Sequence, residues 1–445
     1  MTAFPARRWY LGLASAFALF TLYGSLIPFA WRPLSLADAW QQFSLLVLDV
    51  PPGRISRTDF LANILLFIPW GFSMCGAILA DRRSRRLAVA APVVVLAAGL
   101  VLSTLAEFLQ TFTPGRVPTH RDIAAQTLGS SVGIALWVVF GDVLTTWTRS
   151  SLATAPANRR WRVLALIVTA WVLVSLAPFD ISVDIGDIAR RVRMRRIVLI
   201  PFSDPGLTTW RRMWDMFAEV LGAVPLGLLL SGRLGRHSPV ATIARGVAIV
   251  FLIEAAQVFL RSHTASVTDA FFGSLGVIAG VVWGARYPLD QTVLDPPAGR
   301  GVSRPAVGIG IAWLVILAFY HWQPFDVAMN AQTIKNRLDH LSLVPFATYA
   351  AGSPINALND ILTKLGLALP LGGVCAFVPR QRQPLTRTTI ATWTCVGIAV
   401  FTMLEFGQLF LRSRTPDVTD VWTGAVGVLA GAIVTHWARS DSATH

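Results

Sequence analysis

The sequence predicts an all-α protein, a polytopic membrane helix bundle of about 12 transmembrane helices in three parallel four-helix repeats. Three observations predict this fold class: an apolar composition, a series of apolar runs of membrane-spanning length, and a set of motifs that recurs three times. Of the 445 residues, 54% are hydrophobic and 14% are charged, and the mean hydropathy is +0.58. Because a soluble domain carries about 25% charged residues, this composition excludes the soluble-enzyme folds.

Apolar runs long enough to cross about 30 Å of hydrocarbon follow one another along the whole chain. They lie at roughly 9–27, 60–80, 87–112, 122–145, 161–177, 214–231, 240–260, 269–284, 305–320, 357–377, 389–411 and 418–437. The first run follows Arg7 and Arg8 and is longer than the core of a signal peptide, which has about 7–15 residues. We therefore expect the first run to be a retained helix.

A recurring order of motifs divides these runs into three repeats, which we place at 1–150, 151–300 and 301–445. In each repeat a Pro-Phe closes the first helix, an Asp before a Pro-x-Gly begins the second, an E-x-x-Q ends the third, and another Asp opens the fourth. The Glu and the last Asp are fifteen residues apart in every repeat. An even number of helices per repeat predicts that all three enter the membrane in the same orientation.

The polar motif residues fall at the helix ends on one side of the membrane, because successive helices alternate in direction. Glu107 and Gln110 are three residues apart and share a helix face. Glycines follow the last Asp of each repeat at helical spacing, and small residues let membrane helices approach closely. We therefore expect the fourth helix to pack its glycine face on the third, so that Glu107 meets Asp122 near the headgroup level.

Two readings of these acids stay open. In the structural one, the Asp residues cap helices and Glu107 forms an ion pair with Arg116 across a short loop. In the functional one, the acids form a site, because ionisable groups at membrane depth are functional candidates by default. Glu219 and Lys364 stand where repeat one has Asn63, and Lys364 is placed either for a local pair with Asp360 or for a pair with Glu219.

The net charge of +14 comes almost entirely from arginine. The arginines are scattered over short loops, so no nucleic-acid partner is expected. Apart from the exceptional 178–213 loop, Arg and Lys are more frequent on the side of the termini, which predicts cytoplasmic termini and an extracytoplasmic acid face. Residues 187–200 of that loop alternate Arg with apolar residues, as in an interfacial amphipathic segment. Weaker equivalents lie at 36–48 and 331–343, and a solvated basic loop is the alternative.

The motifs together resemble the VanZ-like family of bacterial membrane proteins. The resemblance rests on Asp59, Asn63, Phe67, Pro69, Gly71, Glu107, Gln110, Arg116 and Asp122 in repeat one, and it extends over nearly the whole chain as three tandem copies. It implies an integral protein of the bacterial inner membrane linked to the cell envelope and, for the founding member, lowered susceptibility to teicoplanin. It implies no reaction. Repeat one matches best, so we expect it to carry the functional site.

Three functions are compatible with these residues. We favour a protein that binds a lipid or a lipid-linked envelope precursor, over a membrane-interface enzyme and over a transporter. The candidate binding residues are Asp59, Asn63, Glu107, Gln110, Arg116, Asp122, Asp215, Glu254, Gln257, Arg261, Asp269, Asp360, Glu405, Gln408, Arg412 and Asp420. The three cysteines lie in apolar runs without pairing or metal spacing. No cofactor, metal site or disulfide is therefore expected.

Overall fold

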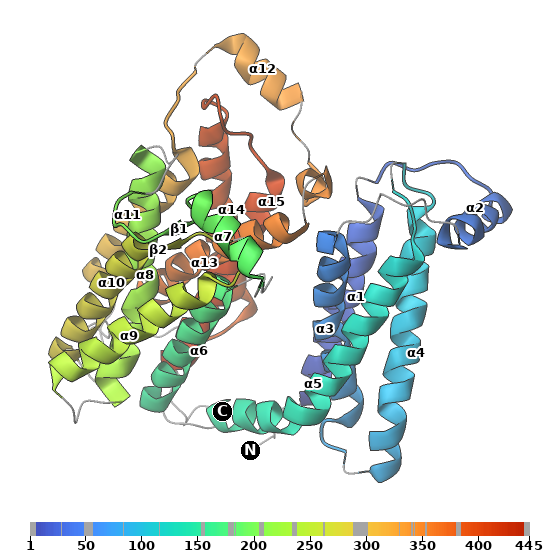
Figure 1. Ribbon diagram of the computed structural model, residues 1–445, viewed down its shortest axis with the longest axis horizontal. Helices are drawn as coiled ribbons and strands as arrows, with labels where there is room; N and C mark the ends of the chain where they lie inside the picture. Colours follow the sequence, from blue (N-terminus) through green and yellow to red (C-terminus); the bar gives the residue numbers. More distant parts are fainter. Residues whose placement is uncertain are drawn as a thin grey trace. The chain divides into compact units, whose positions relative to one another are not determined.

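A computed structural model of the chain is built almost entirely of α-helices (Figure 1). It describes residues 6–27, 29–48, 57–82, 84–114, 116–152, 156–176, 182, 184–203, 209–233, 238–260, 263–287, 301–328, 330–339, 341, 343–351, 354–379 and 384–439. Within these residues, 11 helices are long and apolar enough to cross a membrane. The predicted membrane helix bundle is confirmed. The remaining predicted span, at 161–177, falls on helix α6 (Pro156–Leu176), which is not among these 11.

Each repeat contains four long helices and one short helix between the first two. Repeat one has α1 (Ala6–Leu26), α2 (Leu36–Leu48), α3 (Arg57–Leu79), α4 (Arg85–Gln110) and α5 (His120–Leu152). Repeat two has α6, α7 (Ile185–Arg193), α8 (Thr209–Arg233), α9 (Pro239–Gln257) and α10 (Val267–Arg286). Repeat three has α11 (Arg304–Trp322), α12 (Ala331–Asp339), α13 (Pro354–Phe377), α14 (Arg387–Gln408) and α15 (Val418–Arg439), and a 3₁₀ turn at Ala347–Ala351.

The described residues divide into two compact bodies, one built on repeat one and the other on repeat two with most of repeat three. Each repeat has its own apolar core. Phe67, Val95 and Trp137 lie in that of repeat one, Val277 in that of repeat two, and Phe401 in that of repeat three. A single strand pair, β1 (Ile197–Val198) with β2 (Ala265–Ser266), is present in the described chain and joins the α7 segment to the start of α10.

The fourth helix of each repeat packs its glycines mainly on the second helix, so the expected packing on the third is wrong for most of the glycine face. A Cβ atom on Gly129 would clash with the Ile64 carbonyl of α3, and one on Gly431 would clash with the Leu369 carbonyl of α13. The second helix offers its own glycine, Gly71 in repeat one, to the backbone of the fourth. The helices approach there because both faces are small. The exceptions, Gly273 and Gly424, face the third helix in repeats two and three.

The end of the first long helix lies beside the end of the third. Four residues after the Pro of each Pro-Phe, a backbone N–H donates to the carbonyl of the residue five after the Glu of E-x-x-Q. The three bonds are Arg32 to Phe112 at 2.7 Å, Ser182 to Phe259 at 2.7 Å and Ala328 to Phe410 at 2.8 Å. We call this end of each repeat, where the third helix finishes and the fourth begins, the acid end.

In repeats one and three, the Phe that follows the first long helix has an unusual backbone conformation. Phe29 and Phe325 both have φ of 62°, a left-handed conformation that is unusual for a bulky residue. The corresponding pair of repeat two, Pro178-Phe179, lies outside the described residues.

Candidate functional site

The Glu of each E-x-x-Q fixes the loop that follows it. In all three repeats one carboxylate oxygen accepts a hydrogen bond from the backbone N–H twelve residues further on. The pairs are Glu107 with Thr119 at 3.1 Å, Glu254 with Ser266 at 3.1 Å and Glu405 with Asp417 at 2.9 Å. Glu107 is 1% exposed and Glu405 is 5% exposed. Because a buried carboxylate needs such donors, this bond gives the Glu a structural role in every repeat.

The residue that donates this hydrogen bond to the Glu also caps the fourth helix. The Thr119 hydroxyl accepts from the Asp122 N–H at 3.1 Å, and the Ser266 hydroxyl accepts from the Thr268 N–H at 3.1 Å. In repeat three the Asp417 carboxylate accepts from the Thr419 N–H at 2.8 Å. The expectation that the last Asp is the cap is therefore wrong. That Asp lies three residues beyond the cap, in the first helical turn.

In repeat one, a neutral amide faces this last Asp. Asn63 of α3 donates through Nδ2 to Asp122 Oδ1 at 2.8 Å, and Asn63 Oδ1 accepts from Gln126 Nε2 at 3.1 Å. The Thr119 hydroxyl donates to the other Asp122 oxygen at 2.8 Å. These hydrogen bonds join the second and fourth helices, and Asp122, the last residue in the series, is half-buried.

In repeat three, a charge replaces the amide. Lys364 of α13 pairs with Asp420 of α15, with Nζ 2.5 Å from Oδ1, and the two side chains are 13% and 6% exposed. The pair with Asp420 was not among the two expected ones, which were with Asp360 and with Glu219. Asp360 itself accepts a hydrogen bond from the Tyr349 hydroxyl.

Repeat two places an acid at the same position. Glu219 interacts electrostatically with Asp269 and Glu254, and more weakly with Asp215 on its own helix. The equivalent residues Asn63, Glu219 and Lys364 therefore all face the acid end of their own repeat, where their different charges give the three repeats different chemistry.

The loop arginines also differ. Arg116 stands nine residues after Glu107, and Arg414 stands nine residues after Glu405. Arg414 donates through Nε to the Gln323 carbonyl at 2.8 Å. Arg116 is half-buried and acts electrostatically on Glu107 and Asp122, but within the described residues its side chain has no hydrogen bond and no ion pair within 4.0 Å. The predicted Glu107–Arg116 contact pair is therefore wrong.

The remaining predicted residues are more scattered. Gln257 donates to the Ser175 carbonyl at 3.0 Å, and Gln408 donates to Glu405 at 2.8 Å. Gln110 ends α4 with no side-chain hydrogen bond to another described residue. Asp59 is exposed in the first turn of α3, and Arg412 is exposed. Arg261 lies outside the described part of the chain.

Two arginines that donate to backbone carbonyls, Arg191 and Arg337, were not among the predicted site residues. Arg191 of α7, 6% exposed, donates to the carbonyls of Gln257, Val258 and His263. Arg337 of α12 donates to the equivalent region, the carbonyls of Gln408, Arg412 and Arg414. Each arginine fastens its short helix over the end of the third helix. Both stand thirteen residues after the Pro of Pro-Phe, a spacing that the sequence contains.

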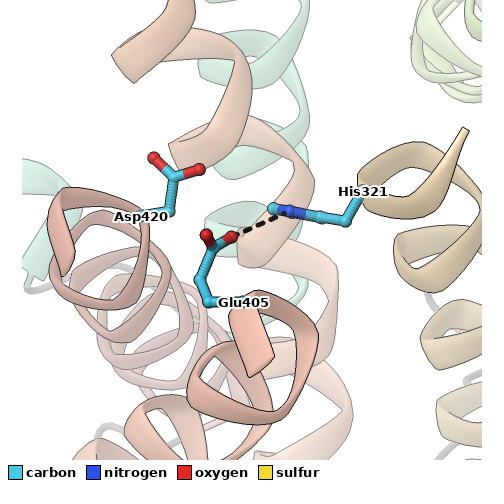
Figure 2. Close-up of side chains that lie close together, drawn as sticks. All are labelled: His321, Glu405 and Asp420. Atoms are coloured by element: carbon cyan, nitrogen blue, oxygen red, sulfur yellow. Dashed lines mark ion pairs between the residues drawn. The ribbon is translucent and has the colours of Figure 1, made fainter. Parts of the chain in front are cut away.

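A histidine was also missed. His321 of α11 is 3% exposed, and its Nδ1 lies 3.4 Å from Glu405 Oε1 (Figure 2). It stands three residues before Pro324, where the other repeats have Ser25 and Ser175. The departure from the repeat pattern was the available signal.

Comparison with known proteins gives one result. A family model described as VanZ/LLP1 matches the chain three times, over residues 5–141, 163–285 and 307–439. No match was found among curated proteins or among solved structures. The three matched segments agree with the three repeats of helices.

Proposed function

Because the chain belongs to the VanZ/LLP1 family of membrane proteins, we propose that it binds the phosphate group of an anionic lipid or lipid-linked cell-envelope component at the acid end of repeat one. The observation that carries the proposal is Arg116, a half-buried guanidinium with no acceptor among the described residues. A guanidinium matches a phosphate through paired, charge-assisted hydrogen bonds. Glu107 and Asp122 hold it electrostatically without occupying its donors.

Repeat one is better suited to this role than repeat three. The corresponding Arg414 already donates to the Gln323 carbonyl, and Lys364 already neutralises Asp420. In repeat one the amide of Asn63 satisfies Asp122 without adding charge. Arg116 therefore keeps available the donors that its equivalent Arg414 directs to a backbone carbonyl.

The proposal is tested with the full-length protein in detergent, by native mass spectrometry with phosphatidylglycerol and phosphatidylcholine as probes. We expect phosphatidylglycerol to be retained in preference. Arg116→Gln should weaken that retention about tenfold or more, since a hydrogen bond to a charged group contributes about 1.5–3 kcal/mol. The retention of phosphatidylglycerol by Arg116→Lys should fall between that of the unaltered protein and that of Arg116→Gln, because lysine keeps the charge but not the planar fork.

Arg82→Gln is the matched control. Arg82 is exposed and follows α3, at the end opposite to Asp59, so its loss changes the net charge equally without touching the acid end. Equal weakening by Arg82→Gln and Arg116→Gln would show a non-specific charge effect and would refute the proposed site.

We also propose that the termini are cytoplasmic and that the acid ends face the outside of a bacterial inner membrane. The support is the distribution of loop arginines and lysines. In a variant lacking Cys75, Cys375 and Cys395, Val117→Cys should react in intact cells with a membrane-impermeant thiol reagent, and Arg82→Cys should not. The opposite labelling pattern would invert the orientation.

An effect on teicoplanin susceptibility is the proposed consequence for the cell. A strain that produces the protein should differ in its inhibitory concentration from a strain without it, and Arg116→Gln should remove the difference at an equal membrane level. An unchanged difference with Arg116→Gln would separate the phenotype from the proposed site.

A further inference from the structure

Repeat three brings three metal-ligating side chains together from three helices. His321 lies on α11, Glu405 on α14 and Asp420 on α15, and Figure 2 shows the His321 ring directed at the Glu405 carboxylate. One ligand atom from each residue lies within 4.8 Å of the other two. The residues are 3%, 5% and 5% exposed. Within the described residues, no other group of three such side chains comes this close.

The spacing and the donor set fit a small transition-metal ion. The distance from His321 Nδ1 to Glu405 Oε1 is 3.4 Å. Zinc bonds of about 2.0–2.2 Å place two ligands of a tetrahedral ion about 3.3–3.6 Å apart. We propose that repeat three binds one divalent transition-metal ion of the zinc class through these three side chains. One imidazole with two carboxylates is a donor set typical of such ions, and the fourth position would remain for water or another ligand.

Hydrogen bonds around the cluster orient its carboxylates, as outer partners do in metal sites. Gln408 Nε2 donates to Glu405 Oε1 at 2.8 Å, and the Asp417 N–H donates to Oε2 at 2.9 Å. Lys364 holds Asp420 through Oδ1. The ammonium balances one carboxylate, and the ion would bring charge for the other. Lys364 is also the natural rival, since its ammonium could be the only cation that the cluster needs.

The proposed site belongs to repeat three because only this repeat has a nitrogen ligand there. Ser25 and Ser175 take the place of His321 in the other repeats. Ligands that lie on three helices, 84 and 15 residues apart in the sequence, produce no metal-binding motif, which is why the sequence predicted no metal. The inference does not depend on the proposed function of repeat one.

The test uses the full-length protein in detergent, treated with a chelator and then dialysed against zinc, with zinc per chain measured by plasma mass spectrometry. We expect one tightly bound zinc in the unaltered protein. His321→Ser should lose it, and His263→Ser, a matched loop histidine, should keep it. Asp420→Asn, a second ligand variant, should weaken zinc binding at least as much as the loss of an outer-shell partner does, which is about tenfold or more. Thermal unfolding in chelator shows whether each variant is folded.

The variant Lys364→Gln distinguishes a bound metal ion from the Lys364 ammonium as the cation of the cluster. If the metal is resident, this variant should still bind one zinc. Zinc bound only by Lys364→Gln would show that the ammonium takes the place of the metal in the natural protein, and would overturn the proposal. The same zinc content in His321→Ser and the unaltered protein, or none in either, would also overturn it.

Discussion

Repeats one and three place different chemistry on the same scaffold. Both use a buried Glu to hold the loop N–H twelve residues later, with Glu107 on Thr119 and Glu405 on Asp417. At the next shared position, repeat one meets its last Asp with an amide and repeat three meets it with Lys364. The comparison teaches that the loop-fixing Glu belongs to the fold, whereas the residue facing the last Asp decides the charge of the acid end.

The largest expected difference concerns that facing residue. In chelator-treated protein, Lys364→Met leaves Asp420 buried without its counter-charge, and removing one partner of a buried pair costs about 3–5 kcal/mol. The matched change Asn63→Leu removes two hydrogen bonds, one to the half-buried Asp122 carboxylate and one from Gln126, and should cost about 1.5–3 kcal/mol. Denaturant titration in detergent measures both free energies of unfolding.

The double variant Lys364→Met with Asp420→Leu should recover much of the loss, because it removes both charges. Equal costs for Lys364→Met and Asn63→Leu, with no recovery in the double variant, would contradict the pairing.

The attachment of the short helix gives the next contrast. Arg337→Gln removes hydrogen bonds to three carbonyls and should cost about 1.5–3 kcal/mol. Repeat one has exposed Gln41 at the equivalent position, and its α2 instead packs buried Phe43 on Phe108, with ring centroids 5.6 Å apart. Gln41→Ala should therefore leave the unfolding midpoint unchanged. A comparable loss from both changes would show that α2 and α12 are attached alike.

The shared helix packing should respond equally in the two repeats. Gly133→Ala in α5 and Gly431→Ala in α15 each push a methyl group into a backbone carbonyl of the second helix. Overpacking of this kind costs about 1–3 kcal/mol. Gly308→Ala, where a Cβ meets nothing within 4 Å, is the control. Tolerance of Gly431→Ala alone would confine the close approach to repeat one.

The helix caps give the smallest effect. Thr119→Ala removes the hydroxyl that caps α5 and should cost about 1 kcal/mol. Ser266→Ala should cost a similar amount in repeat two, where the hydroxyl accepts from Thr268. Thr127→Ala, whose hydroxyl donates only within its own helix, should cost less than either. If Thr119→Ala leaves the free energy of unfolding unchanged, the Thr119 hydroxyl does not cap α5, and Asp122 would again be the candidate cap.

The sequence was sufficient for the helices, the repeats and the gathering of the acids, because these follow from hydropathy and fixed spacing. It was insufficient for partners across helices. The stripe of Gly129 and Gly133 shows that a neighbour approaches closely, but not that the neighbour is the second helix. Lys364 was assigned to nearby acids because helix rotation cannot be read from spacing. Arg337 resembled a solvated charge, since the carbonyls that accept its hydrogen bonds are marked by no sequence pattern.

The central claim is that repeat one, and not repeat three, has a half-buried loop guanidinium without an acceptor among the described residues. The most direct test is the dissociation constant of short-chain phosphatidylglycerol for two matched variants of the full-length protein, Arg116→Gln and Arg414→Gln. We expect Arg116→Gln to weaken binding about tenfold or more and Arg414→Gln to leave it nearly unchanged, because Arg414 already donates to Gln323. Equal weakening by both variants, or weakening by Arg414→Gln alone, would contradict the account.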